Sequence, residues 1–244
     1  MHRTGNCGGP NDPGPGFYTI NKFGENIDVD GEETIWSVGG QFPFLNTAIE
    51  MDLLSTSPDD TLLGTGARTI AITRYDGLNN LIAEEIPMDG QNRVQLSGLT
   101  KISTRLKVSS SGDGNTNAGI IKIVDRATGA IIYQAIQIGQ GQTFSVVQIV
   151  PVGKAGKVRR LKATYAKLTN RNNASLSFNL RLNDGTIQEK YHASISMDKP
   201  EDKKEYLNGG ISAEAGNIVF WQCKETSAAD TPIYAEFDLE LQDA

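Results

Sequence analysis

Few residues in this sequence are of the types that carry out acid–base or nucleophilic chemistry. Its 244 residues include two histidines, His2 and His192, and two cysteines, Cys7 and Cys223. His192 lies in a strand-like segment, but the sequence contains no Gly-x-Ser-x-Gly elbow to supply a partner nucleophile. The cysteines form no Cys-x-x-Cys pattern and lie far apart, which is typical of free thiols in a reducing compartment. We therefore predict that the chain is not an enzyme and holds no cofactor.

Two segments approach the ligand spacing of calcium loops. Residues 28–33 read Asp-Val-Asp-Gly-Glu-Glu, and Asp113, Asn115 and Asn117 have the spacing of the first three ligands of an EF-hand. In the first segment the glycine directly follows the second acid, and the second segment lacks both the central glycine and the final glutamate. We expect solvated turns and no metal site. Whether the loop tips bind a cation or a glycan stays open from the sequence.

Carboxylate pairs for glycoside cleavage need to be close only in space, so a glycosidase or peptidoglycan hydrolase remains an alternative. Glu84 and Glu85 do not supply such a pair, because neighbours on a strand face opposite sides of a sheet. The segment 64–68, Gly-Thr-Gly-Ala-Arg, is not followed by the Gly-Lys-Ser/Thr of a phosphate loop. We interpret it as a turn that leads into a strand.

The charge of the chain limits its partners. The sequence has 23 Lys+Arg against 29 Asp+Glu and a net charge of −6 at pH 7, which argues against nucleic acid as a partner. No apolar run reaches the roughly 20 residues of a membrane span, so we also expect no membrane partner. Basic residues are concentrated in one stretch, which could contact an acidic protein surface: Lys154, Lys157, Arg159 and Arg160.

Apolar residues recur with a period of two along most of the chain, which predicts β-strands with one buried face. Leu176, Phe178, Leu180 and Leu182 alternate with polar residues, and Asn183-Asp184-Gly185 follows as a tight hairpin turn. The run 233–241 alternates between apolar and mostly acidic residues. Frequent glycine turns separate these strands, which favours an all-β antiparallel sandwich of jelly-roll type. A division into two β layers or subdomains stays open. Further strands are predicted at residues 47–53, 68–74, 81–88, 92–96, 102–108, 120–124, 131–138, 144–150, 158–167, 192–197 and 218–224.

Breaks in the pattern divide the chain into three segments. Residues 1–32 are predicted as an extended N-terminal arm, because five glycines and three prolines fall within the first sixteen positions. Residues 33–150 are predicted as one β domain, and residues 151–244 as a C-terminal jelly-roll-like sandwich, since Pro151 ends a ladder. One continuous two-sheet jelly roll uses the same strands and stays an alternative. A helical turn is predicted at residues 200–207, where Pro200 could open it.

Several short motifs at turns and strand edges carry a resemblance to a known family. They are Phe-Gly-Glu-Asn-Ile-Asp-Val-Asp at 23–30 with Glu-Thr-Ile-Trp at 33–36, Gly-Thr-Gly-Ala-Arg-Thr at 64–69, Gly-Gln-Gly-Gln-Thr at 139–143 and Val-Pro-Val-Gly-Lys at 150–154. In this order they resemble motifs of small virion structural proteins from tailed double-stranded DNA bacteriophages, over most of residues 20–244. That family has alanine where Val152 stands. The resemblance implies a capsid decoration, head-fibre or other accessory protein, and it transfers no catalytic residues.

The expected function is that of a decoration or cement protein, which binds the exterior of the phage head and stabilises it. The alternative is a head-fibre, tail or receptor/glycan-binding component of the virion. Expected partners are the major capsid protein, other virion proteins and further copies of the chain, with a trimer as one form. The expected location is the virion, assembled in the host cytoplasm. Aromatic residues near the arm are candidate partner contacts, although packing of Trp36 on its own sheet is the simpler interpretation: Phe17, Tyr18, Phe23, Trp36, Phe42 and Phe44.

Overall fold

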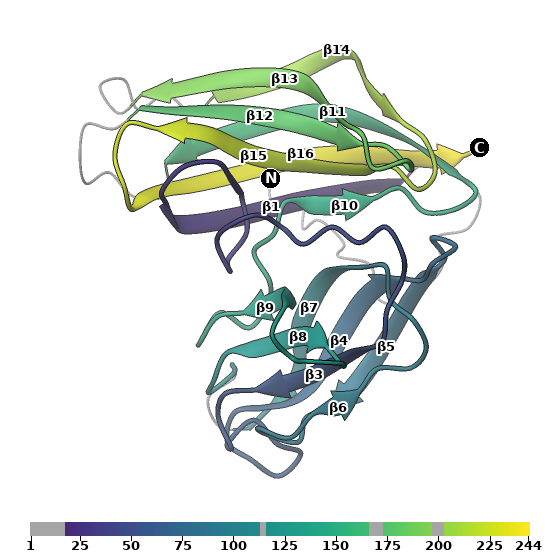
Figure 1. Cartoon of the computed structure of the whole chain (residues 1–244), viewed down its shortest axis with the longest axis vertical. Coiled ribbons are helices and arrows are strands. Elements are labelled where there is room, and N and C mark those ends of the chain that lie inside the picture. The colour runs from purple at the N-terminus through teal and green to yellow at the C-terminus, as the bar shows by residue number, and fades with distance from the viewer. Residues whose placement is uncertain (1–17, 113–115, 166–172, 197–202) are drawn as a thin grey trace, which may run out of the picture.

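The chain folds into β-strands in the part that the structure describes. This computed structural model describes residues 18–112, 116–165, 173–196 and 203–244, which contain sixteen antiparallel strands and no helix (Figure 1). The prediction of an all-β, antiparallel fold is confirmed. Within these ranges, accordingly, no helix has the length and apolar character that crossing a membrane requires.

Nine of these strands form two sheets that face each other, and we call them the main unit (Figure 1). Phe178 of one sheet meets Phe237 of the other edge to face, with ring centroids 5.3 Å apart. The first sheet has the strand order β1 (Tyr18–Val29), β16 (Thr231–Asp243), β11 (Lys154–Tyr165) and β14 (Lys203–Ala213). The second has the order β10 (Val147–Ile149), β15 (Ile218–Thr226), β12 (Asn173–Arg181) and β13 (Ile187–Ser196), and β2 (Glu33–Thr34) also pairs with β15.

The core of the main unit follows directly from the alternation of residue types. In β16 every second residue from Ile233 to Leu241 is buried, while the polar residues between them are partly exposed. Trp221 and Cys223 of β15 are buried in the same core, where Cys223 packs as a small interior residue. Burial of apolar surface between the two sheets therefore provides the main driving force for this unit.

The predicted hairpin between β12 and β13 is confirmed. The Leu182 amide donates to the Thr186 carbonyl over 2.8 Å, and the Gly185 amide donates to the Leu182 carbonyl over 3.0 Å. Gly185 has φ of 90°, a conformation that residues with a Cβ rarely adopt. The Asp184 carboxylate accepts the Thr186 amide over 2.8 Å and so closes the turn from its side chain.

The other seven strands form an inserted unit, which lies in the chain between β2 and β10 (Figure 1). Two sheets face each other here as well, because Leu53 and Ile123 of one share a buried cluster with Ile70 and Leu106 of the other. The first sheet has the order β6 (Val94–Gln95), β3 (Met51–Ser55), β8 (Ile121–Asp125) and β9 (Ile132–Ile136). The second has the order β5 (Leu81–Pro87), β4 (Ala67–Tyr75) and β7 (Ile102–Ser111).

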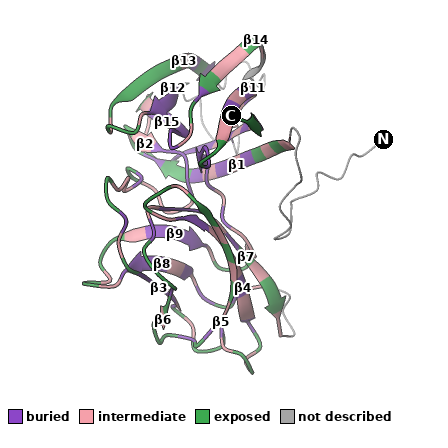
Figure 2. Ribbon diagram, turned by 90° about the vertical axis from the view of Figure 1, so that its right-hand side faces the viewer, coloured by how far each residue is buried: buried purple, intermediate pink, exposed green. Residues whose placement is uncertain are grey.

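A third buried cluster joins the two units. It brings Tyr75 and Ile102 of the inserted unit against Val147 and Phe220 of the main unit. Figure 2 shows buried segments continuing from one unit into the other. The Gln148 amide also donates to the Tyr75 hydroxyl over 3.0 Å inside this cluster. The units therefore pack against each other through a buried cluster, and neither is tethered by a linker alone.

The strand pairing differs from the predicted division at residues 32 and 150. Residues 1–17 of the predicted arm lie outside the described residues, and Tyr18–Val29 forms the long strand β1 paired with β16 instead of an arm. The main unit also takes up β2 and β10, which precede the predicted boundary. Alternation in the sequence reports that a segment is a strand, but carries no information on its partner.

The helical turn predicted at residues 200–207 is wrong for its described part. Residues 203–207 belong to β14, which pairs with β11 in register from Ala163↔Lys203 to Gly156↔Ala213. Gly209 and Gly210 both have positive φ and coincide with the irregularity in this pairing. Pairing with β11 thus overrides the local helical signal of Pro200 and its charged neighbours.

Candidate functional site

Two of the aromatic residues predicted to contact a partner are buried inside the chain. Trp36 and Phe42 are 2% and 4% exposed, and their ring centroids lie 4.9 Å apart. The stack continues through Phe44 to Phe220 of β15, with centroid separations of 4.9 and 4.8 Å. The Trp36 indole donates to the Gly40 carbonyl over 3.1 Å. Trp36 and Phe42 therefore join the units from within, and the simpler interpretation of Trp36 as a packing residue fits this placement.

The remaining aromatic candidates lie along β1. Tyr18 is half-buried, and the Lys154 ammonium lies 5.6 Å from its ring centroid. Phe23 is also half-buried and meets Phe144 edge to face at 5.4 Å. Phe17 lies outside the described residues. The two described side chains thus contact their own chain, and each keeps only part of its surface for another molecule.

The basic stretch is neutralised by the neighbouring strand. Lys154, Arg159 and Arg160 lie on β11, beside the acidic outer face of β16. A register irregularity between Val158 and Arg160 lets both arginines reach that face. The pairs and distances are Lys154 Nζ to Asp243 Oδ1 at 2.7 Å, Arg159 Nε to Glu240 Oε2 at 2.7 Å and Arg160 Nε to Asp238 Oδ2 at 2.6 Å.

Arg160 is the centre of this charge ladder. It binds Asp238 through two nitrogens and also pairs with Glu236, and these carboxylates raise its pKa further above the ordinary value. Lys157 lies opposite Glu240 in the same register. The sequence signal for a cationic contact surface is therefore a within-sheet ion-pair ladder in the described chain. The alternating acids of β16 were the sequence feature that could have indicated it.

The predicted acidic turn uses its carboxylates for contacts within the chain. Glu33 accepts the Asn26 side-chain amide over 2.8 Å and the Gly40 amide over 2.9 Å. Glu32 pairs with Lys224 at 3.2 Å. Asp113 and Asn115 of the other candidate loop lie outside the described residues. Throughout the described ranges, no group of three or more His, Cys, Asp or Glu side chains is arranged to hold a metal ion.

His192 has two partners in an order that resembles a catalytic triad. Its Nε2 lies 3.3 Å from the Ser175 hydroxyl, and its Nδ1 lies 3.3 Å from a Glu189 carboxylate oxygen. A bulge opposite Phe178 and Asn179 turns Glu189 and His192 to the same face. However, β12 is paired on both sides, so the amides near Ser175 are occupied by the sheet ladders. The group has no built oxyanion site, and we derive no acyl transfer from it.

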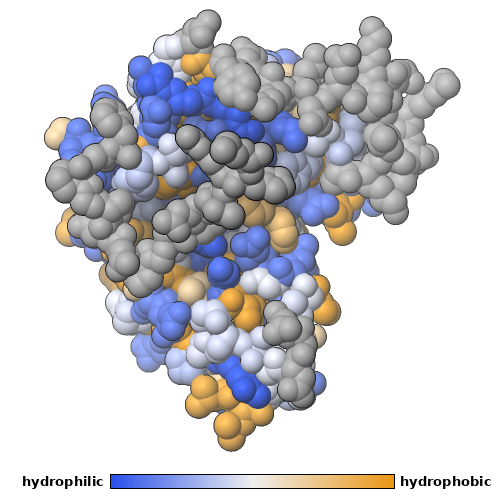
Figure 3. All heavy atoms as spheres, turned by 180° about the vertical axis from the view of Figure 1, so that it is seen from behind, coloured by the Kyte–Doolittle hydropathy of each residue, from blue (hydrophilic) through white to orange (hydrophobic). Residues whose placement is uncertain are grey.

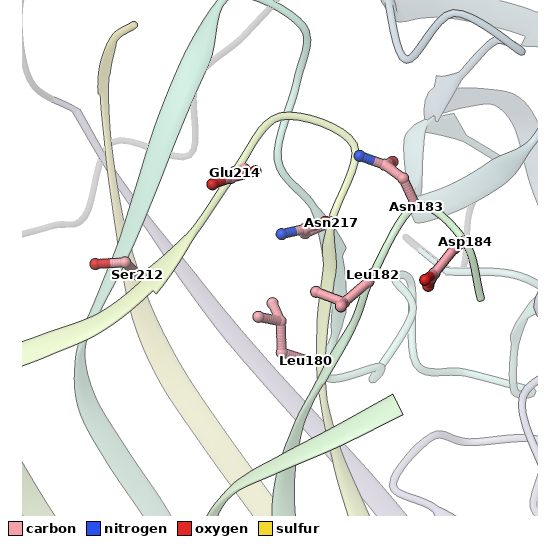
Figure 4. A pocket seen from close by; sticks show the side chains of 7 residues that line it. All are labelled: Leu180, Leu182, Asn183, Asp184, Ser212, Glu214 and Asn217. Carbon is pink, nitrogen blue, oxygen red and sulfur yellow. The ribbon is translucent and has the colours of Figure 1, made fainter. Parts of the chain in front are cut away.

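A hollow lies at one end of the main unit. It has a volume of about 470 Å³, within the usual range for small-molecule sites. Figure 4 shows it between the β12–β13 turn and the β14–β15 turn, with Leu180 and Leu182 pointing into its floor. The other lining residues are polar: Asn183, Asp184, Ser212, Glu214 and Asn217.

Two turns hold the walls of this hollow in place. The Asn183 side-chain amide donates to the Ala215 carbonyl over 3.0 Å and links one turn to the other. Gly216 has φ of 84°, and a Cβ there would lie 2.2 Å from Asn183 Oδ1. The Asn217 amide donates to the Glu214 carbonyl over 3.0 Å. The hollow is therefore preformed by a close packing of turns that only a glycine at position 216 permits.

Sequence reasoning identified these turns but not the hollow. Asn183-Asp184-Gly185 and Gly216 were recognisable as turn residues, whereas their meeting at one end of the sheets depends on long-range pairing. Comparison of the chain with protein-family models, curated proteins and solved structures finds no match.

Proposed function

We propose that the chain is a virion structural protein, a decoration or cement protein that binds the exterior of a phage head through protein–protein contacts. The observation that carries this proposal is the strand order of the main unit. Apart from the short β2, its strands run in the chain as β1 and β10 to β16, and they pair as β1-β16-β11-β14 and β10-β15-β12-β13. This order supports the proposal of an eight-strand jelly roll, an architecture of viral capsid proteins and lectins.

The fold supports the function by analogy, and the motif resemblance points to the same class of protein. In this proposal the jelly roll provides a rigid framework, and the inserted unit interrupts the connection between its first two strands. The partner is the major capsid protein or another virion protein, and the chain acts as a homo-oligomer such as a trimer. Its location is the virion, assembled in the host cytoplasm. No bond-breaking chemistry is part of the proposal.

The contact surface that best fits this role is a leucine turn after β3. Leu63 is 91% exposed and Leu62 is 56% exposed. The turn is rigid, because the buried Asp60 carboxylate accepts amides from Ala67 at 2.7 Å and Gly119 at 2.9 Å. Figure 3 shows apolar side chains gathered at the free end of the inserted unit. A turn whose backbone is already held in place loses little backbone entropy on binding, which suits a contact anchor.

Occupancy on purified particles tests this proposal. Removing residues 1–17 tests the predicted arm, and Leu63→Ser tests the leucine turn. Ile187→Ser is the matched control, because Ile187 is also exposed but lies on β13 of the main unit. We expect the deletion and Leu63→Ser to lower the copy number per particle and Ile187→Ser to leave it unchanged. Absence of the unmodified chain from purified particles would overturn the proposal.

A second function is a receptor- or glycan-binding component of the virion. The hollow beside Asn217 favours it, because an apolar floor with a few polar groups around it is typical of small-ligand sites.

A further inference from the structure

The side chain of Asn217 is buried without a hydrogen-bond partner in the described chain. The residue is 5% exposed, and its backbone is fixed by the Glu214 carbonyl and by the Val150 amide, which donates to its carbonyl over 2.9 Å. Its side-chain amide makes no such bond, and Figure 4 shows it directed into the hollow. A buried amide without a partner is unfavourable, and an apolar residue would suit the end of a core better. The polar atoms of this amide stay accessible from the hollow, so a ligand there can supply the partner that the described chain does not.

The lining of the hollow defines the chemistry of that partner. Leu180 and Leu182 offer an apolar floor, and Ser212 of β14 and Glu214 just after it offer exposed oxygens. Lysine and arginine are absent from its described lining, so an anionic ligand would meet uncompensated carboxylates. A simple cation would have no use for the leucine floor or for an amide donor. The lining fits a neutral molecule with hydroxyl groups on its edge and C–H groups on its face.

We propose that this hollow binds a saccharide, with one sugar ring seated on Leu180 and Leu182. Sugar hydroxyls both donate and accept, so they can donate to the Glu214 carboxylate and bond to both ends of the Asn217 amide. The hollow is open to solvent, so a terminal sugar of a longer glycan can enter it. This inference rests on the second proposed function, glycan binding, and is independent of attachment to a capsid.

Saturation-transfer NMR with the full chain tests the proposal. The probes are the methyl glycosides of glucose, galactose, mannose and N-acetylglucosamine, with methylammonium and inorganic phosphate as chemical controls. We expect transfer to the ring protons of at least one glycoside at millimolar concentration. Asn217→Ala should weaken its binding by roughly tenfold, as expected for the loss of a buried hydrogen-bonded contact. Glu214→Gln should weaken it as well.

Two further variants separate binding from folding. Asn173→Ala removes an amide at the opposite end of β12 and should leave binding unchanged. Asn217→Leu should bind no glycoside while its melting temperature stays equal to or above that of the unmodified chain. Were Asn217→Leu to unfold, the exposed Glu214→Gln would still decide the result. Absence of transfer from all four glycosides, transfer that both Asn217→Ala and Glu214→Gln leave unchanged, or binding of the two ions alone would overturn the proposal. Particle occupancy is measured in a separate experiment, so the capsid-binding proposal and the glycan-binding proposal can each be refuted without the other.

Discussion

Arg160 of β11 and Asp238 of β16 lie opposite each other in the sheet and form a two-point ion pair. Arg160 Nε lies 2.6 Å from Oδ2 of Asp238, and Nη2 lies 2.9 Å from Oδ1. Both side chains are largely shielded from water, with exposures of 15% and 25%. Bidentate pairs of this kind are stronger than single surface ion pairs. The pair thus makes a basic stretch of the sequence part of the sheet's own stability.

Replacing Arg160 should destabilise the chain more than replacing Arg159. Arg160→Ala leaves two partly buried carboxylates without a partner, and we expect a loss of about 1–3 kcal/mol in the free energy of unfolding. Arg159→Ala breaks a pair whose members are 42% and 34% exposed, and should cost less than about 1 kcal/mol. Urea unfolding of both variants measures this difference. If both variants lost the same free energy of unfolding, burial would not determine how much each ion pair contributes to stability.

Trp36→Ala should act on stability rather than on a binding surface. The ring is buried at the junction of the two units, so its removal should cost about 3–5 kcal/mol. Thermal unfolding of Trp36→Ala and of the half-exposed Phe23→Ala compares an interior aromatic with one on β1. A Trp36→Ala variant that keeps its melting temperature would contradict the interior role.

The sequence predicted the strands far better than their partners. The segment 68–74 became β4 and the run 233–241 became β16 with small changes at the ends, because alternation is a local property. The pairing of β1 with β16 joins residues more than 200 positions apart, and nothing in the alternation specifies it. For the same reason Trp36 could be interpreted as a surface anchor: its neighbour Phe220 lies far along the chain.

Lys22 should make stability depend on pH. Its ammonium is buried between the units, where it donates to the Thr104 carbonyl, and burial together with the nearby Arg105 lowers its pKa to about 7 from 10.5. Between these two values the unfolded chain binds more protons at this site than the folded chain does. Stability should therefore rise from pH 7 towards pH 10 and stay at its lower level below pH 7.

Lys22→Met tests that dependence. Removing the buried charge should raise the free energy of unfolding at pH 6 by about 1–3 kcal/mol and flatten the rise above pH 7. Melting temperatures of both chains between pH 6 and pH 9 measure the effect. An unchanged pH profile in Lys22→Met would mean that this lysine is not the group responsible.

Gly64→Ala should disturb the leucine turn. A Cβ at this position would lie 2.0 Å from the Asp59 carbonyl oxygen, so the backbone around Leu63 would have to move. We expect a loss of about 2–4 kcal/mol, whereas Gly31→Ala, where no atom lies within 4 Å, should change stability little. Differential scanning calorimetry of the pair measures this contrast, and similar melting temperatures for both variants would argue against a rigid turn.

The sequence alone does not predict the candidate hollow, because the hollow depends on how distant turns pack together. The turns at 183–185 and 216 were visible as glycine signals, but Asn217 looks like any polar turn residue until its burial is known. Its lack of a partner is a property of the packed turns and not of its neighbours in the chain.

A cryo-electron microscopy reconstruction of the phage particle whose genome encodes this chain tests the central claim most directly. The account predicts density for both units, joined as in Figure 1, on the outer surface of the head and repeated with its symmetry. A particle whose surface carries no such density, with the chain found only in the infected cell, would contradict it.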